Sequence, residues 1–207
     1  MMPRKFFVVA LVVLSCMFLP SLASASSTDF SNSGGTLAGT NAGLTLTGSM
    51  LIAVTGFNGG GMINGDLGTV AFTTGALSSG DLQMGGTFAS GGTFTINGNG
   101  TGGLPNGVIF SGTFSGSVTW TLATLANGTH NYTLTGVVTG TMGGMNVNGV
   151  TVQLTINTGK GFYSGSTLIA GGNTTIESSV PEPSTLVMFG TGGLSMLGML
   201  RRKLLAS

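Results

Sequence analysis

Across residues 108–142 large apolar residues alternate with polar residues over most of the run, and this alternation leaves few folds open to the chain. Residues two apart share one face of a strand, and no stretch between the termini repeats with the helical period of 3.6 residues. The pattern therefore predicts half-buried strands. The apolar residues that carry this pattern stand at even positions, with glycines between them: Val108, Phe110, Phe114, Val118, Trp120, Leu122, Tyr132, Leu134, Val138 and Met142.

An Asn-Gly pair at Asn127 divides this run and predicts a hairpin. A two-residue loop would pair Trp120 with Thr135, and so place inward-facing residues opposite outward-facing ones. A three-residue loop over residues 126–128, with Gly128 in the left-handed conformation, instead pairs Trp120 with Leu134. Continued without a break, this register also pairs Leu122 with Tyr132. It gives every inward glycine a larger partner: Val118 with Gly136, Gly116 with Val138, Phe114 with Gly140, and Gly112 with Met142.

Ahead of the next Asn-Gly pair, Asn148-Gly149, the apolar residues change from even positions, up to Met142, to odd positions at Met145 and Val147. We expect it to form a two-residue type I′ turn that pairs Val147 with Val150 and Met145 with Val152. The change of parity requires one extra residue, and Gly143-Gly144 is the expected β-bulge. A further strand over residues 162–169 should return after the turn at residues 158–160.

The first half of the chain is less regular, with one good strand over residues 44–54 and weaker ones at 67–73, 82–89 and 92–97. The many glycines (39 of 207 residues) and the seven Asn-Gly pairs indicate closely spaced turns. Together they predict an all-β domain, an antiparallel meander forming a sandwich or a barrel. A β-solenoid is the alternative, although Gly-Thr-Phe recurs at residues 86, 92 and 112 without a fixed period. The strands lack the Lys and Pro that guard sheet edges, so self-association through sheet edges is expected.

The N-terminus predicts a secretory signal peptide over residues 1–25. Arg4 and Lys5 precede the apolar run 6–19, and the small residues Ala23 and Ala25 place cleavage before Ser26. An uncleaved membrane helix and a lipid attached to Cys16 are the alternatives. Cys16 is the only cysteine, so the exported chain can form no disulfide within itself.

The C-terminus has three parts in order: a short polar motif, an apolar stretch over residues 186–200, and a basic end. The motif is Val180-Pro181-Glu182-Pro183-Ser184, and the basic end is Arg201-Arg202-Lys203. We expect a membrane helix at 186–200 whose basic end stays in the cytoplasm, with residues 180–207 forming a unit apart from the β domain of residues 26–179. A linker followed by an ordinary tail anchor is the alternative.

This order and spacing resemble the PEP-CTERM sorting signal of Gram-negative bacteria over residues 180–205. The resemblance implies processing near the Pro-Glu-Pro motif by a membrane-embedded exosortase. It also implies delivery through the inner membrane to the cell surface or the extracellular matrix, usually in producers of exopolysaccharide. It carries no information about the β domain, because the family shares the tail alone.

Ionisable groups are scarce in the β domain. Its one basic residue is Lys160 and its acidic residues are Asp29, Asp66, Asp81 and Glu177, so its net charge is −3. This balance excludes the basic footprint of a nucleic-acid-binding protein.

His130 has no second His or Cys to complete a metal site, and we expect it to be a solvated turn residue. A Ser-His-Asp set with Asp66 or Asp81 lacks a Gly-x-Ser-x-Gly elbow. Residues 59–67 resemble one imperfect copy of a calcium-binding nonapeptide. We therefore expect no catalytic residue, no metal and no cofactor.

The aromatic residues offer the remaining candidate site. Trp120 and Tyr132 fall on the predicted inward face, where they would pack. Tyr163 has the opposite parity to Phe162, which makes it the expected exposed residue and a possible glycan contact. The sequence thus predicts a secreted, non-enzymatic surface or extracellular-matrix protein associated with exopolysaccharide or biofilm, with a glycan-binding or adhesive module as the alternative.

Overall fold

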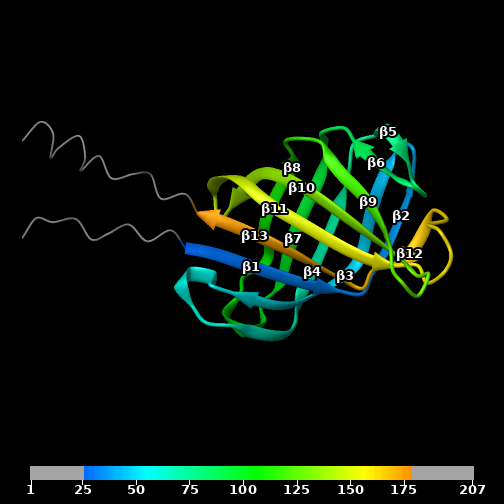
Figure 1. Cartoon of the computed structure of the whole chain (residues 1–207). Coiled ribbons are helices and arrows are strands. Elements are labelled where there is room, and N and C mark those ends of the chain that lie inside the picture. Colours follow the sequence, from blue (N-terminus) through cyan, green and yellow to red (C-terminus); the bar gives the residue numbers. More distant parts are fainter. Residues whose placement is uncertain (1–25, 179–207) are drawn as a thin grey trace, which may run out of the picture. The chain divides into compact units, whose positions relative to one another are not determined.

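The computed structural model describes residues 26–178, which form a closed antiparallel β-barrel of eight strands (Figure 1). The ring closes because β10 pairs with β11 as well as with β8, and the last strand pairs with the first. Its members follow chain order, so the barrel is an up-and-down meander. In ring order they are β1 (Ser26–Ser33), β3 (Gly43–Thr55), β4 (Ile63–Thr73), β7 (Gly91–Asn99), β8 (Asn106–Phe114), β10 (His130–Met142), β11 (Met145–Asn157) and β13 (Gly171–Ser178). The predicted all-β meander is confirmed in its barrel form, and the solenoid alternative is wrong.

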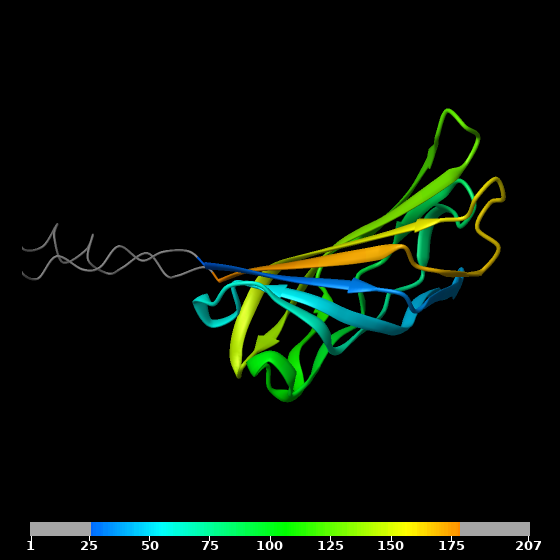
Figure 2. The same cartoon turned by 90° about the horizontal axis from the view of Figure 1, so that it is seen from below.

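The two ends of the barrel are built differently. Ser26 pairs with Ser178 at one end, where β1 and β13 lie side by side (Figure 2). The connections at that end are the 3-10 turns η1 (Phe57–Gly59) and η2 (Thr101–Gly103) with their flanking residues, and the tight turn at 143–144. All the additional strands belong to the four connections at the opposite end, which we call the distal end: β2 (Thr36–Thr40), β5 (Leu77–Asp81), β6 (Gly85–Phe88), β9 (Val118–Thr124) and β12 (Ser166–Leu168).

Closure leaves few free sheet edges. Within the described residues, β5 pairs only with β6 and β12 pairs only with β2, so these two short strands present outer edges. Self-association through sheet edges, as expected from the sequence, stays a prediction, and these two strands are the ones with a wholly unpaired edge among the described strands. Between residues 26 and 178 there is no helix of the length and apolar character that crossing a membrane requires.

The hairpin of β9 and β10 has the predicted register. Trp120 lies opposite Leu134, and Thr121 lies opposite Thr133. Gly128, in the three-residue loop, has a φ of 77° and donates its N–H to the Leu125 carbonyl. The loop expected from the sequence is confirmed.

The register of β8 against β10 differs from the prediction. Phe114 lies opposite Val138 instead of Gly140, and Gly112 lies opposite Gly140 instead of Met142. The connection between β8 and β9 adds two residues on their side of the sheet, so every β10 partner of β8 shifts by two while residues 110–114 keep their predicted faces. Val108 does not face inward as predicted: it is 61% exposed and Ile109 is buried instead, because the register of β8 against β7 shifts at this point. The expectation that each inward glycine meets a larger cross-strand partner is wrong at Gly112. Gly136 does leave room for a ring, since a Cβ there would lie 2.7 Å from Phe114.

The predicted turn and bulge of the next hairpin are exchanged. Gly143 and Gly144 form the two-residue turn, with φ values of 57° and 81°, and Met142 pairs with Met145. Asn148-Gly149 lies within β11 and supplies the extra residue at the register shift. A glycine pair satisfies the positive φ values of a type I′ turn as well as Asn-Gly does, so the apolar pattern alone could not rank the two sites.

The other predicted strands are partly confirmed. The strands expected at residues 44–54, 67–73 and 92–97 correspond to β3, β4 and β7. In the segment 82–89 only β6 is a strand, and the segment 162–169 is reduced to β12, which pairs with β2. The sequence did not indicate β1 or β13, the polar strands that close the ring.

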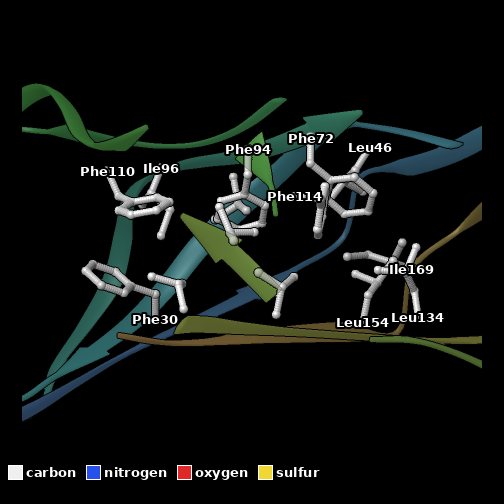
Figure 3. Close-up of a cluster of buried hydrophobic side chains, with 14 of the residues drawn as sticks. Phe30, Leu46, Phe72, Phe94, Ile96, Phe110, Phe114, Leu134, Leu154 and Ile169 are labelled. Carbon is white, nitrogen blue, oxygen red and sulfur yellow. The ribbon is translucent and has the colours of Figure 1, made fainter. Parts of the chain in front are cut away.

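Apolar side chains fill the barrel interior (Figure 3). A cluster of phenylalanines occupies its middle, with Phe72 stacked on Phe94 at 6.1 Å and Phe114 edge-on to both rings. Such ring pairs add about 0.5–1.5 kcal/mol each beyond their burial. Facing outward, a row of polar residues crosses six strands with consecutive Cα pairing: Thr87, Thr119, Thr135, Gln153, Asn173 and Ser31.

Candidate functional site

Three aromatic side chains meet under the distal end of the barrel. Trp120 from β9 stacks on Tyr132 from β10, with ring centroids 4.9 Å apart and planes 15° apart. Tyr163, from the loop between β11 and β12, lies edge-on to Trp120 at 5.5 Å. All three are at most 1% exposed, so the prediction that Trp120 and Tyr132 face inward is confirmed.

The polar atoms of these three residues, the aromatic clamp, hold the distal connections in place. Trp120 donates its Nε1–H to the Leu82 carbonyl at 2.9 Å, and Tyr132 donates its hydroxyl to the Gln83 carbonyl at 2.6 Å. The Tyr132 oxygen also accepts the backbone N–H of Tyr163. Tyr163 in turn donates its hydroxyl to the Leu37 carbonyl at 3.3 Å. The clamp therefore fixes the β5–β6 turn and the β11–β12 loop against the barrel and ties that loop to β2.

The expected exposure of Tyr163 is wrong. Tyr163 is 1% exposed, whereas its neighbour Phe162 is 45% exposed. The two side chains do point to opposite sides, as their parity requires, but the inward side is that of Tyr163. Burial raises the pKa of Tyr163 from 10.0 to about 12, because a phenolate loses hydration in apolar surroundings. Tyr163 cannot offer its ring face to a glycan.

His130 is not a solvated turn residue. It is 8% exposed, its Nδ1 lies 3.0 Å from the Thr124 hydroxyl, and Phe162 stacks on its ring at 4.4 Å. The backbone of His130 is bonded in both directions to the turn after β11, through Gly159 and Thr158. The ring is thus used in packing between β10 and the β11–β12 loop.

The hydrogen bonds described for the aspartate side chains go to residues other than His130. Asp29 accepts a hydrogen bond from the Thr175 hydroxyl, and Asp81 accepts hydrogen bonds from the backbone N–H groups of Gln83 and Met84 in its own turn. Asp66, in the segment that resembles a calcium-binding repeat, accepts the Asn99 amide. Within residues 26–178 no three His, Cys, Asp or Glu residues gather in a way that could hold a metal ion.

An open cleft of about 730 Å³ lies above the aromatic clamp. Three connections far apart in the sequence line it: the β2–β3 turn, the β5–β6 turn and the β11–β12 loop. Its exposed polar side chains are Thr40, Asn41, Gln83 and Ser164, and Tyr163 lies at its floor. Among residues 26–178, no charged residue lines the cleft. A second hollow of about 390 Å³ adjoins it across the β2–β3 turn and shares Gly39, Thr40 and Ala42.

Sequence reasoning missed this distal cleft. Asn41 and Gln83 stand in turns without any motif, and their neighbourhood arises only when β2 and the β5–β6 hairpin fold over the same barrel end. The aromatic residues beneath were the available signal, because a buried Trp or Tyr requires a hydrogen-bond partner and here finds it on the cleft-forming turns.

The remaining predicted site residues lie outside the described range. They are Ala23 and Ala25 of the signal-peptide cleavage site, the motif Val180, Pro181, Glu182, Pro183 and Ser184, the expected membrane helix at 186–200, and Arg201, Arg202 and Lys203. Ser26, the first residue after the expected cleavage point, is the first residue of β1.

Comparison with known proteins bears on this C-terminal segment. Residues 179–203 match the family model of the PEP-CTERM protein-sorting motif. The search of curated proteins and the search of solved structures both found no match. The match covers the Pro-Glu-Pro motif and the basic end together, as the resemblance required. The chain therefore carries a PEP-CTERM sorting motif, which implies export to the cell surface or the extracellular space and processing by an exosortase.

Proposed function

We propose that this chain is a non-enzymatic protein of the cell surface or extracellular matrix that works in the exopolysaccharide or biofilm layer. The sorting motif at residues 179–203 carries the proposal. Its support from the fold is a closed barrel whose interior is filled by side chains and whose outer face carries rows of Thr, Asn and Gln. Such a surface suits a hydrated polymer matrix.

The placement of the ionisable side chains supports a role without catalysis. Catalysis requires groups that can move protons or attack a substrate from an accessible position. Here His130 is held between Thr124 and Phe162, and Asp81 caps its own turn. These groups are engaged in holding loops and strands together.

We further propose that the apolar stretch at residues 186–200 holds the precursor at the inner membrane, with Arg201, Arg202 and Lys203 on the cytoplasmic side. This arrangement follows from the apolar stretch and the positive-inside rule. Cleavage near Pro181-Glu182-Pro183 then releases the barrel or transfers it to the surface.

Changing Pro181, Glu182 and Pro183 to alanine tests this route. The variant should accumulate as a larger species that fractionates with the inner membrane, while the wild-type protein appears smaller and outside it. Immunoblots of cell fractions give both size and location. An identical size and location for variant and wild type would refute processing at this motif.

The distal cleft favours a second function, that of a glycan-binding or adhesive module. It is open, uncharged and lined by hydroxyl and amide side chains that pair well with sugar hydroxyls. Pull-down of the full-length chain on the polysaccharides of the producing cell tests this function. Failure to bind any of those polymers would count against it.

A further inference from the structure

We infer that the distal cleft binds a segment of a neutral polysaccharide chain, an inference that rests on the second proposed function. The cleft lies where all four distal connections carry extra strands, and three of them contribute its lining. Binding groups commonly stand on loops held by a rigid scaffold. The opposite end of the barrel has shorter connections and no additional strand among the described residues.

The chemistry of the lining selects an uncharged, hydroxyl-rich ligand. Asn41 and Gln83 offer amide donors and acceptors, and Thr40 and Ser164 offer hydroxyls, all on exposed side chains. Within the part of the chain that the structure describes, no Lys, Arg, Asp or Glu lines the cleft or the hollow beside it. An ionic polymer would therefore find no charged partner in either of them.

The shape selects a chain over a single sugar. The cleft and the second hollow share Gly39, Thr40 and Ala42 in their linings, so they adjoin each other at the β2–β3 turn. Both are open to solvent, so a long polymer can lie across the turn without threading its end into the protein.

The aromatic clamp prepares the cleft for binding. Bonds from Trp120 to Leu82, and from Tyr132 to Gln83, fix the turn that presents the Gln83 side chain. The backbone bond from Tyr163 to Tyr132 fixes the residue before Ser164. The lining is thus ordered before the ligand arrives, which lowers the entropic cost of binding.

The test measures binding of the full-length chain, purified in detergent, to immobilised polymers. The neutral probes are hydroxyethylcellulose, dextran and galactomannan, and the charged probes are alginate and chitosan. We expect at least one neutral polymer to bind more tightly than both charged ones. The double variant Asn41→Ala with Gln83→Ala should bind it about ten-fold more weakly, the effect expected for two lost hydrogen bonds.

A matched control removes two amide side chains elsewhere. Asn146→Ala with Asn148→Ala changes exposed positions of β11 outside the cleft and outside the outward polar row, and should leave binding unchanged. Ser164→Trp fills the cleft with a ring at an exposed position and should abolish binding while the thermal unfolding temperature stays near that of the wild type.

The outcomes separate the site from the function. Neutral-polymer binding that survives both cleft variants, or that falls with the β11 control instead, overturns the cleft as the site and leaves the glycan-binding function standing. Preference for alginate or chitosan overturns the neutral ligand class. Retention on none of the five polymers counts against the site and the glycan-binding function together.

Discussion

At Gly140 the barrel has no room for a side chain. A Cβ there would lie 2.1 Å from the Ser111 carbonyl oxygen and 2.5 Å from the Cα of Gly112, its cross-strand partner. At Gly116, between β8 and β9, a Cβ would meet no atom within 4 Å. The glycine excess of the sequence thus includes positions where close strand packing requires glycine and positions where the space is free.

Replacing each of these two glycines by alanine should give opposite results. Gly140→Ala should lower the free energy of unfolding by about 1–3 kcal/mol or more, because the backbone must shift to admit the methyl group. Gly116→Ala should raise that free energy slightly, by about 0.4–1 kcal/mol, since it restricts the unfolded chain. Urea denaturation of the two variants measures both. Equal stabilities would contradict the packing at Gly140.

Tyr163 should make the fold sensitive to alkaline pH. Its pKa is about 12 in the folded protein and 10.0 ordinarily. Between these values the phenol ionises in the unfolded chain but not in the folded one, so the unfolded state binds fewer protons and stability falls as pH rises. The urea midpoint should decline above pH 10 in the wild type and decline less in Tyr163→Phe. A parallel decline in both proteins would show that Tyr163 makes no contribution.

At the scale of the strands, Asn-Gly pairs mark bulges as well as turns. Asn127-Gly128 lies in a hairpin loop, while Asn148-Gly149 lies inside β11 and Asn64-Gly65 lies inside β4. The pairs at Asn64 and Asn148 fall at register shifts. A left-handed glycine relieves strain in a turn and in a bulge alike, so the dipeptide by itself cannot tell which one forms.

The turn between β10 and β11 can be tested at Gly143. Asn tolerates its φ of 57°, so Gly143→Asn should keep or raise the thermal unfolding temperature. Gly143→Val should cost about 1–2 kcal/mol, because a β-branched residue is disfavoured in the left-handed region. A lower unfolding temperature for Gly143→Asn than for Gly143→Val would argue against a turn at this site.

At the scale of the whole molecule, the first and last described strands hold the ring together. β1 and β13 pair over seven positions, and Phe30 of β1 is fully buried in the common core. A barrel closed in this way has no independent half. Destabilising β1 should therefore loosen strands that do not touch it.

Phe30→Ala should lower the free energy of unfolding by about 3–5 kcal/mol, as expected for an aromatic ring removed from a core. Amide hydrogen exchange should then accelerate in β7 and β8 as well as in β1 and β13. Met62→Ala, at a residue that is 64% exposed, is the control and should change neither measurement. Faster exchange limited to β1 and β13 would show that the ring opens locally.

The sequence by itself determined the strand-rich fold, the loop at residues 126–128, the sorting motif and the inward face of most apolar residues in the central run, Phe110 to Val138, but not of Val108. These depend on local chemistry: alternation with a period of two, a left-handed glycine and a contiguous motif. It could not determine which strands pair, since a shift of two residues preserves every face, as β8 and β10 demonstrate. Ring closure, the burial of Tyr163 and the distal cleft were decided by the tertiary structure. Each depends on contacts between residues distant in the chain, such as Tyr163 with Leu37, which no local pattern encodes.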